Sequence, residues 1–109
     1  MTETEFDTLA TATLDAIESA IEATGADIEA TRTGNVLTLE LGDGSKVVIN
    51  SQAPTQQMWV AARSGGFHYA RQADEWRDTR DGSELFAALS RILSSQGGEP
   101  VLLKPQRLD

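Results

Sequence analysis

The middle of the chain is a series of short segments in which apolar and polar residues alternate, with no helical pattern between them. A period of two residues is typical of β-strands. Strands that follow one another through short glycine- or proline-containing joins fold as an antiparallel meander. The expected strands are DIEATR from Asp27, VLTLEL from Val36, SKVVINS from Ser45, QQMWVAA from Gln56, FHYAR from Phe67 and a short one in DEWRD around Trp76.

A helical pattern flanks this region on both sides. Thr2 and Glu5 have the spacing of a capping box, and Gly25 is expected to end the first helix. Asp81-Gly82-Ser83 offers turn and cap residues for a second helix, which Gly97-Gly98 should terminate. The apolar residues with helical spacing are Phe6, Leu9, Ala10, Thr13, Leu14, Ile17, Ala20 and Ile21 in the first helix, and Leu85, Phe86, Leu89, Ile92 and Leu93 in the second.

These patterns predict an α+β fold in one domain over residues 1–109. The strands show a single continuous apolar face, so both helices should pack on that face of an antiparallel sheet of five or six strands. The tail PVLLKPQRL is too apolar at Val101 to Leu103 to be left in water, and we expect it to pack against the helices.

The strands from Lys46 and Gln57 place a tryptophan on the polar side of the sheet. Val47, Ile49, Met58 and Val60 form a plausible core face. The opposite face then carries Trp59 beside the amides of Asn50, Gln52 and Gln57. A rigid aromatic among adaptable hydrogen-bonding groups suits a partner-docking surface. The alternative is that a loop or the C-terminal tail covers Trp59.

The net charge of −8 comes entirely from the first 31 residues, which contain eight acids and no Lys or Arg. This asymmetry argues against nucleic acid and anionic membranes as partners, and in favour of cations or a basic protein surface. Asp15, Glu18 and Glu22 form an uncompensated row on the first helix, in which each like-charge pair costs about 0.2–0.5 kcal/mol. The row is either a functional acidic surface or a solvated helix face.

Several functional classes lack their sequence requirements. With no cysteine and one histidine, the chain has no thiol catalysis, no thiolate metal site and no multi-histidine site. It has neither a phosphate-binding loop nor an apolar run of membrane length, and its N-terminus has no signal core, so we expect a cytoplasmic protein. Ser64, His68 and Asp74 do not form a catalytic motif, and His68 is expected on the outer sheet face.

The remaining chemistry is that of oxygen ligands. Carboxylates without histidine or thiolate suit Fe³⁺, Fe²⁺, Mn²⁺, Mg²⁺ or Ca²⁺ and discriminate poorly among these ions. Exposed carboxylates keep much of their water, so binding is expected to be weak, multiple and sensitive to salt.

Several motifs occur together in one order and spacing. They are the Gly44-Ser45-Lys46 step leading to Ile49-Asn50, the Gln-x-Pro-x-x-Gln-x-Trp segment from Gln52 to Trp59, Gly65-Gly66 before an aromatic residue, and Trp76. With Glu5-Phe6 and Leu9-Ala10 in the first helix, and Leu85, Phe86 and Leu89 in the second, they cover nearly all of the chain. In these motifs the sequence resembles the frataxins, most closely the bacterial members.

This resemblance implies a two-layer sandwich and a non-enzymatic role in iron–sulfur cluster assembly. It implies a regulator of the cysteine desulfurase and scaffold machinery, or an iron donor, that is a monomer or oligomerises with iron. Iron (Fe²⁺ or Fe³⁺) would bind weakly to Glu3, Glu5, Asp7, Glu18, Glu22, Asp27 and Glu29, which Asp15 joins by geometry only. The desulfurase–scaffold assembly would approach Asn50, Gln52, Gln57 and Trp59.

Two other functions stay open at this point. Some frataxins are reported to oxidise and store iron, although the chain has no Glu-x-x-His di-iron motif. An acidic interaction module without a metal role is the other alternative. The sequence also departs from many relatives, because Ser51 replaces a basic residue, and Ser19 and Ala23 interrupt paired acids. We therefore expect a thinner acidic surface with a lower iron capacity.

Overall fold

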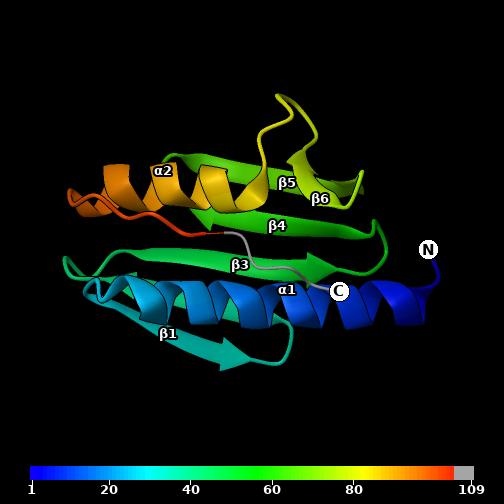
Figure 1. The fold of residues 1–109 in the computed structure, drawn as a ribbon, viewed down its shortest axis with the longest axis horizontal. Coiled ribbons are helices and arrows are strands. Elements are labelled where there is room, and N and C mark those ends of the chain that lie inside the picture. Colours follow the sequence, from blue (N-terminus) through cyan, green and yellow to red (C-terminus); the bar gives the residue numbers. More distant parts are fainter. Residues whose placement is uncertain (105–109) are drawn as a thin grey trace.

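The computed structural model describes residues 1–104, which form a layer of two helices and a layer of six strands (Figure 1). The elements are α1 (Glu3–Thr24), β1 (Ile28–Thr33), β2 (Val36–Leu41), β3 (Lys46–Gln52), β4 (Gln57–Ala62), β5 (Gly65–Gln72), β6 (Glu75–Asp78) and α2 (Leu85–Gly97). The strands lie in the order β1-β2-β3-β4-β5-β6, and each neighbouring pair is antiparallel. The predicted meander between two helices is confirmed.

Local chemistry sets the helix ends. The Thr2 hydroxyl accepts a hydrogen bond from the Glu5 amide at 3.1 Å, and the Glu5 carboxylate accepts one from the Thr2 amide at 2.8 Å. This is the predicted capping box. Gly25 ends α1 with a φ of 68°, a left-handed conformation that glycine adopts without steric strain.

The second helix begins differently from the sequence expectation. Its N-cap is Glu84, whose carboxylate accepts hydrogen bonds from the amides of Phe86 and Ala87. Asp81, one of the expected cap residues, instead accepts a hydrogen bond from the Ser83 amide in the turn before the helix. A glutamate is long enough to reach the same free amides that a shorter cap residue serves.

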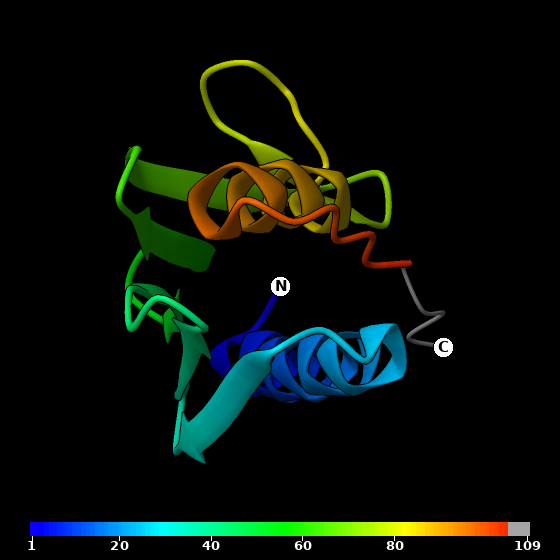
Figure 2. The ribbon, with the colours of Figure 1, turned by 90° about the vertical axis from the view of Figure 1, so that its left-hand side faces the viewer.

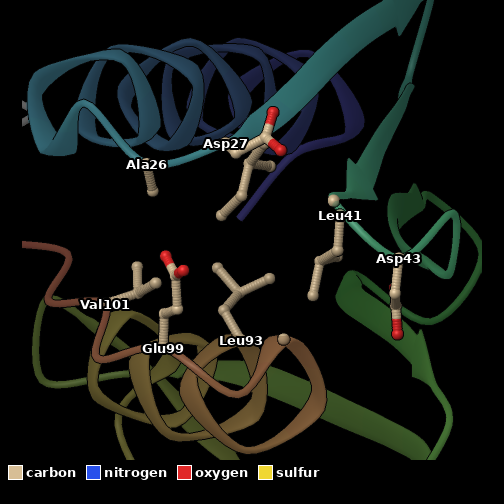
Figure 3. A pocket seen from close by; sticks show the side chains of 10 residues that line it. Ala26, Asp27, Leu41, Asp43, Leu93, Glu99 and Val101 are labelled. Atoms are coloured by element: carbon tan, nitrogen blue, oxygen red, sulfur yellow. The ribbon is translucent and has the colours of Figure 1, made fainter.

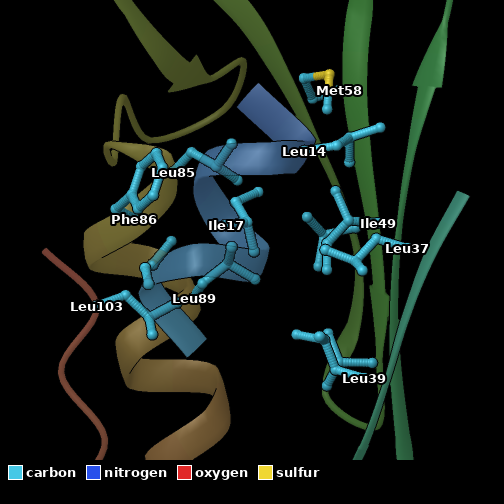
Figure 4. Packing of buried hydrophobic residues seen from close by; sticks show 14 of the residues in the cluster. Leu14, Ile17, Leu37, Leu39, Ile49, Met58, Leu85, Phe86, Leu89 and Leu103 are labelled. Carbon is cyan, nitrogen blue, oxygen red and sulfur yellow. The ribbon is translucent and has the colours of Figure 1, made fainter. Parts of the chain in front are cut away.

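The core lies between the two layers (Figure 2). Both helices lie on the same side of the sheet, as the single apolar sheet face predicted. Figure 4 shows Leu14 and Ile17 of α1 and Leu85 and Leu89 of α2 directed toward the sheet residues. The sheet contributes the buried side chains of Leu37, Leu39, Ile49, Met58 and Val60.

Trp76 links the edge of the sheet to the first helix. Its side chain is buried, and its indole nitrogen donates a hydrogen bond to the buried Thr13 hydroxyl at 2.9 Å. Phe6 packs against the same indole edge to face, with the ring centroids 6.1 Å apart. A buried indole N–H needs such an acceptor, and Thr13 supplies it from within the apolar stripe of α1.

The chain after α2 returns along that helix, as predicted. Val101 and Leu103 are buried, whereas Leu102 between them points outward. The hydroxyls of Ser94 and Ser90 accept hydrogen bonds from the amides of Val101 and Leu103 at 2.8 and 2.9 Å. The expectation is confirmed for this part of the tail, and residues 105–109 lie outside the described residues. Within residues 1–104, no helix is long and apolar enough to cross a membrane.

Candidate functional site

The sheet face away from the helices gathers the four residues predicted to bind a partner. The β3–β4 register pairs Asn50 with Trp59 and Gln52 with Gln57. Their side chains therefore share one face, opposite to the buried Ile49 and Met58 of the same strands. Strand parity read from the sequence placed this group correctly.

Trp59 is held in a fixed position on this face. Its indole nitrogen donates a hydrogen bond to the Gln57 side-chain oxygen at 2.8 Å. The ring stacks on the His68 imidazole of β5, with centroids 4.3 Å apart and planes 14° from parallel. Trp59 is half-buried and His68 is exposed, so one edge of the stacked pair stays accessible to a partner.

The tail alternative for Trp59 is wrong for the described residues. Val101 and Leu103 pack on the helix layer, on the other side of the sheet from the indole. The cover that Trp59 does have comes from its own sheet neighbours, Gln57 and His68. Strand alternation placed His68 on the outer face but did not show the stack. The turn at Arg63-Ser64 was the available signal, because it sets Trp59 opposite His68.

The residues on one side of this pair are small or apolar. The neighbouring cross-strand row on the same face pairs Val48 with Ala61 and Ala61 with Gly66. Val36 lies opposite Asn50 on the other side. Short side chains beside the stacked rings let a partner approach the sheet closely. We call the face formed by Val48, Asn50, Gln52, Gln57, Trp59, Ala61 and His68 the outer sheet face.

The acids predicted to bind metal occupy several distinct environments. Glu3, Asp7 and Glu22 are exposed along α1. Glu5 is committed to the capping box, and its hydrogen bonding with Thr2, led by the Thr2 amide that donates to its carboxylate, holds the pKa of Glu5 below its ordinary value. Within residues 1–104, no group of three or more His, Cys, Asp or Glu side chains is arranged to hold a metal ion.

Asp15 and Glu18 require a correction, because the row that they start is not uncompensated. Arg32 of β1 reaches across to α1, and its Nη1 lies 2.8 Å from Asp15 Oδ1 and 3.1 Å from Glu18 Oε1. Because no lysine or arginine precedes Arg32 in the sequence, these acids were predicted to be unpaired. The charge pattern along the sequence could not show that Arg32, the first basic residue of the chain, lies against α1 in the folded protein.

Glu29 and Asp27 lie apart from the acids of the helix. Glu29 projects from the side of β1 that faces away from the helices, opposite Glu40 of β2. Asp27 lines a cavity of about 240 Å³ between the C-terminal ends of the two helices. Figure 3 shows Asp27 and Glu99 at the rim of this cavity, and Leu41 and Leu93 deeper within it. The eight predicted acids are thus divided among α1, the segment after it and β1.

Comparison with known proteins defines the class. A family model described as a frataxin-like domain matches residues 1–99. The chain therefore belongs to the frataxin family.

The relatives narrow this class. A protein of Janthinobacterium sp. (strain Marseille) is 55% identical, over 95% of this chain and 97% of its own length. One from Cupriavidus taiwanensis is 57% identical, over 90% of this chain and 92% of its own. Both are named iron-sulfur cluster assembly protein CyaY.

Solved structures agree with this assignment. Frataxin from Psychromonas ingrahamii, of the CyaY protein family, superimposes with a TM-score of 0.90 at 36% identity, over 96% of this chain and 100% of that one. A trimeric frataxin from the yeast Saccharomyces cerevisiae, complexed with ferrous iron, has a TM-score of 0.63 at 30% identity, over 79% of each chain. The frataxin fold predicted from the sequence is confirmed.

Proposed function

We propose that this chain is a non-enzymatic protein of iron–sulfur cluster assembly that regulates a cysteine desulfurase and its scaffold. Relatives that match it over nearly their whole length carry the assembly name. The observation that carries the proposal is the stacked Trp59–His68 pair among amides and small side chains on the outer sheet face. A preorganised aromatic loses little entropy when a partner covers it.

Iron is the substrate or cargo in this proposal, and it binds to exposed carboxylates. Glu3, Asp7 and Glu22 offer only carboxylate oxygens to a metal ion, and none of them forms an ion pair with a described residue. Separate carboxylates on a hydrated helix surface bind hard cations weakly and with little selectivity. The yeast relative complexed with ferrous iron supports iron as the physiological ion.

Cluster assembly on a scaffold by a cysteine desulfurase, measured with and without this chain across a range of Fe²⁺ concentrations, tests the proposal. We expect the chain to change the assembly rate, with an effect that depends on the iron concentration. An assembly rate that is the same with and without the chain at every iron concentration would contradict it. Oxygen consumption measured in the same samples separates this role from a ferroxidase, which would consume oxygen in proportion to the added iron.

A further inference from the structure

Arg32 occupies an unusual position for an arginine. It lies on the helix-facing side of β1, opposite the fully buried Leu37 of β2. Its side chain is only 19% exposed. An edge strand lets such a side chain lay its apolar stem against the sandwich while its charged end reaches the adjacent helix.

The guanidinium group is fixed from two directions. Its Nη1 contacts one oxygen each of Asp15 and Glu18, at 2.8 and 3.1 Å. Its Nε donates a hydrogen bond to the Gly34 carbonyl at 2.7 Å, in the turn after β1. A planar group held at both ends loses little further freedom when it pairs with carboxylates.

We propose that Arg32 is an internal counter-cation that weakens the binding of external cations to Asp15 and Glu18. This inference rests on the proposed function, in which α1 binds hard cations through its carboxylates. A divalent ion at Asp15 or Glu18 must compete with the guanidinium charge, which already contacts one oxygen of each carboxylate. The open acids of α1 are then Glu3, Asp7 and Glu22, so the helix offers two separated cation-binding stretches with a partly neutralised segment between them.

The competing charge is a fixed one, because an arginine side chain is a permanent cation in proteins. It therefore weakens cation binding at both acids without abolishing it. The effect should be larger at Glu18 than at Asp15, because the side chain of Glu18 is 29% exposed and that of Asp15 is 66% exposed. A basic partner protein meets the same obstacle, since its lysines and arginines would compete for the same oxygens.

Arg32→Gln tests this directly, with Arg63→Gln as the matched control. Arg63 pairs with Asp43 at 3.2 Å in a separate turn, so its replacement removes the same charge without touching α1. Mg²⁺ is the probe, because it is hard and diamagnetic. The side-chain carboxyl ¹³C shifts of Asp15 and Glu18 are followed by NMR in wild type and both variants, together with those of Glu3, Asp7 and Glu22.

We expect the apparent Mg²⁺ affinity at Asp15 and Glu18 to rise by about two- to fivefold in Arg32→Gln, the range that the loss of an exposed ion pair represents. Arg63→Gln should leave it at the wild-type value. The role of Arg32 would be overturned if Asp15 and Glu18 had the same Mg²⁺ titration midpoint in wild type and Arg32→Gln. It would also be overturned if Arg63→Gln raised their Mg²⁺ affinity as much as Arg32→Gln does. A different result would contradict the proposed function: in the wild type, Mg²⁺ would not shift the carboxyl signals of Glu3, Asp7 and Glu22.

A second pair of variants gives the same answer without changing Arg32. Glu18→Gln should lower the total Mg²⁺ response of α1 only slightly, because Arg32 already pairs with Glu18. Glu22→Gln should lower the total response of α1. Equal losses in the two variants would show that Arg32 does not distinguish Glu18 from Glu22.

Discussion

The two tryptophans show how strand parity gives one residue type two roles. Trp76 points toward the helices, is 2% exposed, and bonds to the buried Thr13. Trp59 points the other way, where it stacks on His68 and donates to Gln57. The first indole therefore contributes to the core, and the second is the one that we propose to dock a partner.

Truncating each tryptophan in turn should separate these roles. Trp76→Ala should lower the free energy of unfolding by about 3–5 kcal/mol, as expected for a buried tryptophan. Trp59→Ala should cost less than that and weaken binding to the desulfurase–scaffold assembly by roughly 2 kcal/mol or more. Denaturant unfolding and titration calorimetry on both variants measure the two quantities. A large stability loss in Trp59→Ala with unaltered binding would contradict the docking role.

Tyr69, the single tyrosine, gives a prediction about pH. Burial, followed by the nearby Asp78 and Asp81 carboxylates, raises the pKa of its phenol from 10 to about 12. The folded protein then keeps this proton longer than the unfolded chain does. Stability is therefore complete below pH 10 and falls as the pH rises toward 12, by on the order of 2 kcal/mol in all.

Ultraviolet absorbance follows the phenol directly. It should titrate near pH 12 in the folded protein and near 10 in urea, and Tyr69→Phe should flatten the alkaline fall in stability. A phenol that titrates at the same pH with and without urea would refute the burial effect.

At this scale, the sequence predicted the face of each residue better than its contacts. Alternation placed Trp59 and His68 on the outer sheet face because parity depends only on position along a strand. It did not predict their stack, although the short turn between β4 and β5 sets the two residues opposite each other. The reach of Arg32 to α1 could not be predicted, because it depends on how β1 packs against the helix. The N-cap at Glu84 was missed because a longer side chain replaced the usual short one.

Among the elements, α1 carries most of the charge and shows how tertiary contact alters it. Its capping box, apolar stripe and Gly25 terminus follow from local sequence, and the structure matches them. The electrostatics of its outer surface do not follow from local sequence, since Arg32 pairs with Asp15 and Glu18, the first two acids of the row. Identical substitutions along this helix should therefore differ in effect.

Glu22→Lys and Glu18→Lys make that comparison. Glu22→Lys should leave the free energy of unfolding within about 0.5 kcal/mol of wild type, because Glu22 is exposed. Glu18→Lys should cost about 0.5–1 kcal/mol, because it loses the Arg32 contact and adds a like charge. The sequence alone predicted that both changes would leave folding intact, and the Arg32 contact revises this for Glu18.

Thermal unfolding measures these stability differences. The affinity for the desulfurase at low salt measures how the reversed charge affects binding. Glu22→Lys should bind more weakly at low salt and approach wild type at high salt, as a screened interaction does. Affinity equal to wild type at low salt would exclude a long-range electrostatic contribution of this helix to binding.

The segment after α2 behaves as part of the fold. Leu103 is 2% exposed, and its amide donates to Ser90, a buried residue of α2. Leu103→Ala should lower the free energy of unfolding by about 2–4 kcal/mol. Leu102→Ala is the control, because Leu102 is 67% exposed and should change stability little. Equal effects of the two changes in denaturant unfolding would contradict the packing described for the tail.

For the whole molecule, the two layers separate two kinds of surface. The helix layer carries the exposed acids of α1, and the sheet turns its stacked rings and amides away from that layer. The order of elements and the single apolar sheet face predicted this separation. The sequence also placed Asp27 and Glu29 beyond the end of the first helix, but it did not predict the cavity that Asp27 lines.

The central claim is that one rigid sandwich offers separate surfaces to iron and to the assembly machinery. The most direct test is amide NMR of the labelled chain, titrated in separate samples with Fe²⁺ without oxygen and with the desulfurase–scaffold assembly. Fe²⁺ should first perturb the amides of α1 around Glu3, Asp7 and Glu22. The assembly should perturb the outer sheet face around Asn50, Trp59 and His68. If Fe²⁺ instead acts first around His68 and Asp74, or if the assembly leaves the outer sheet face unperturbed, the account is wrong.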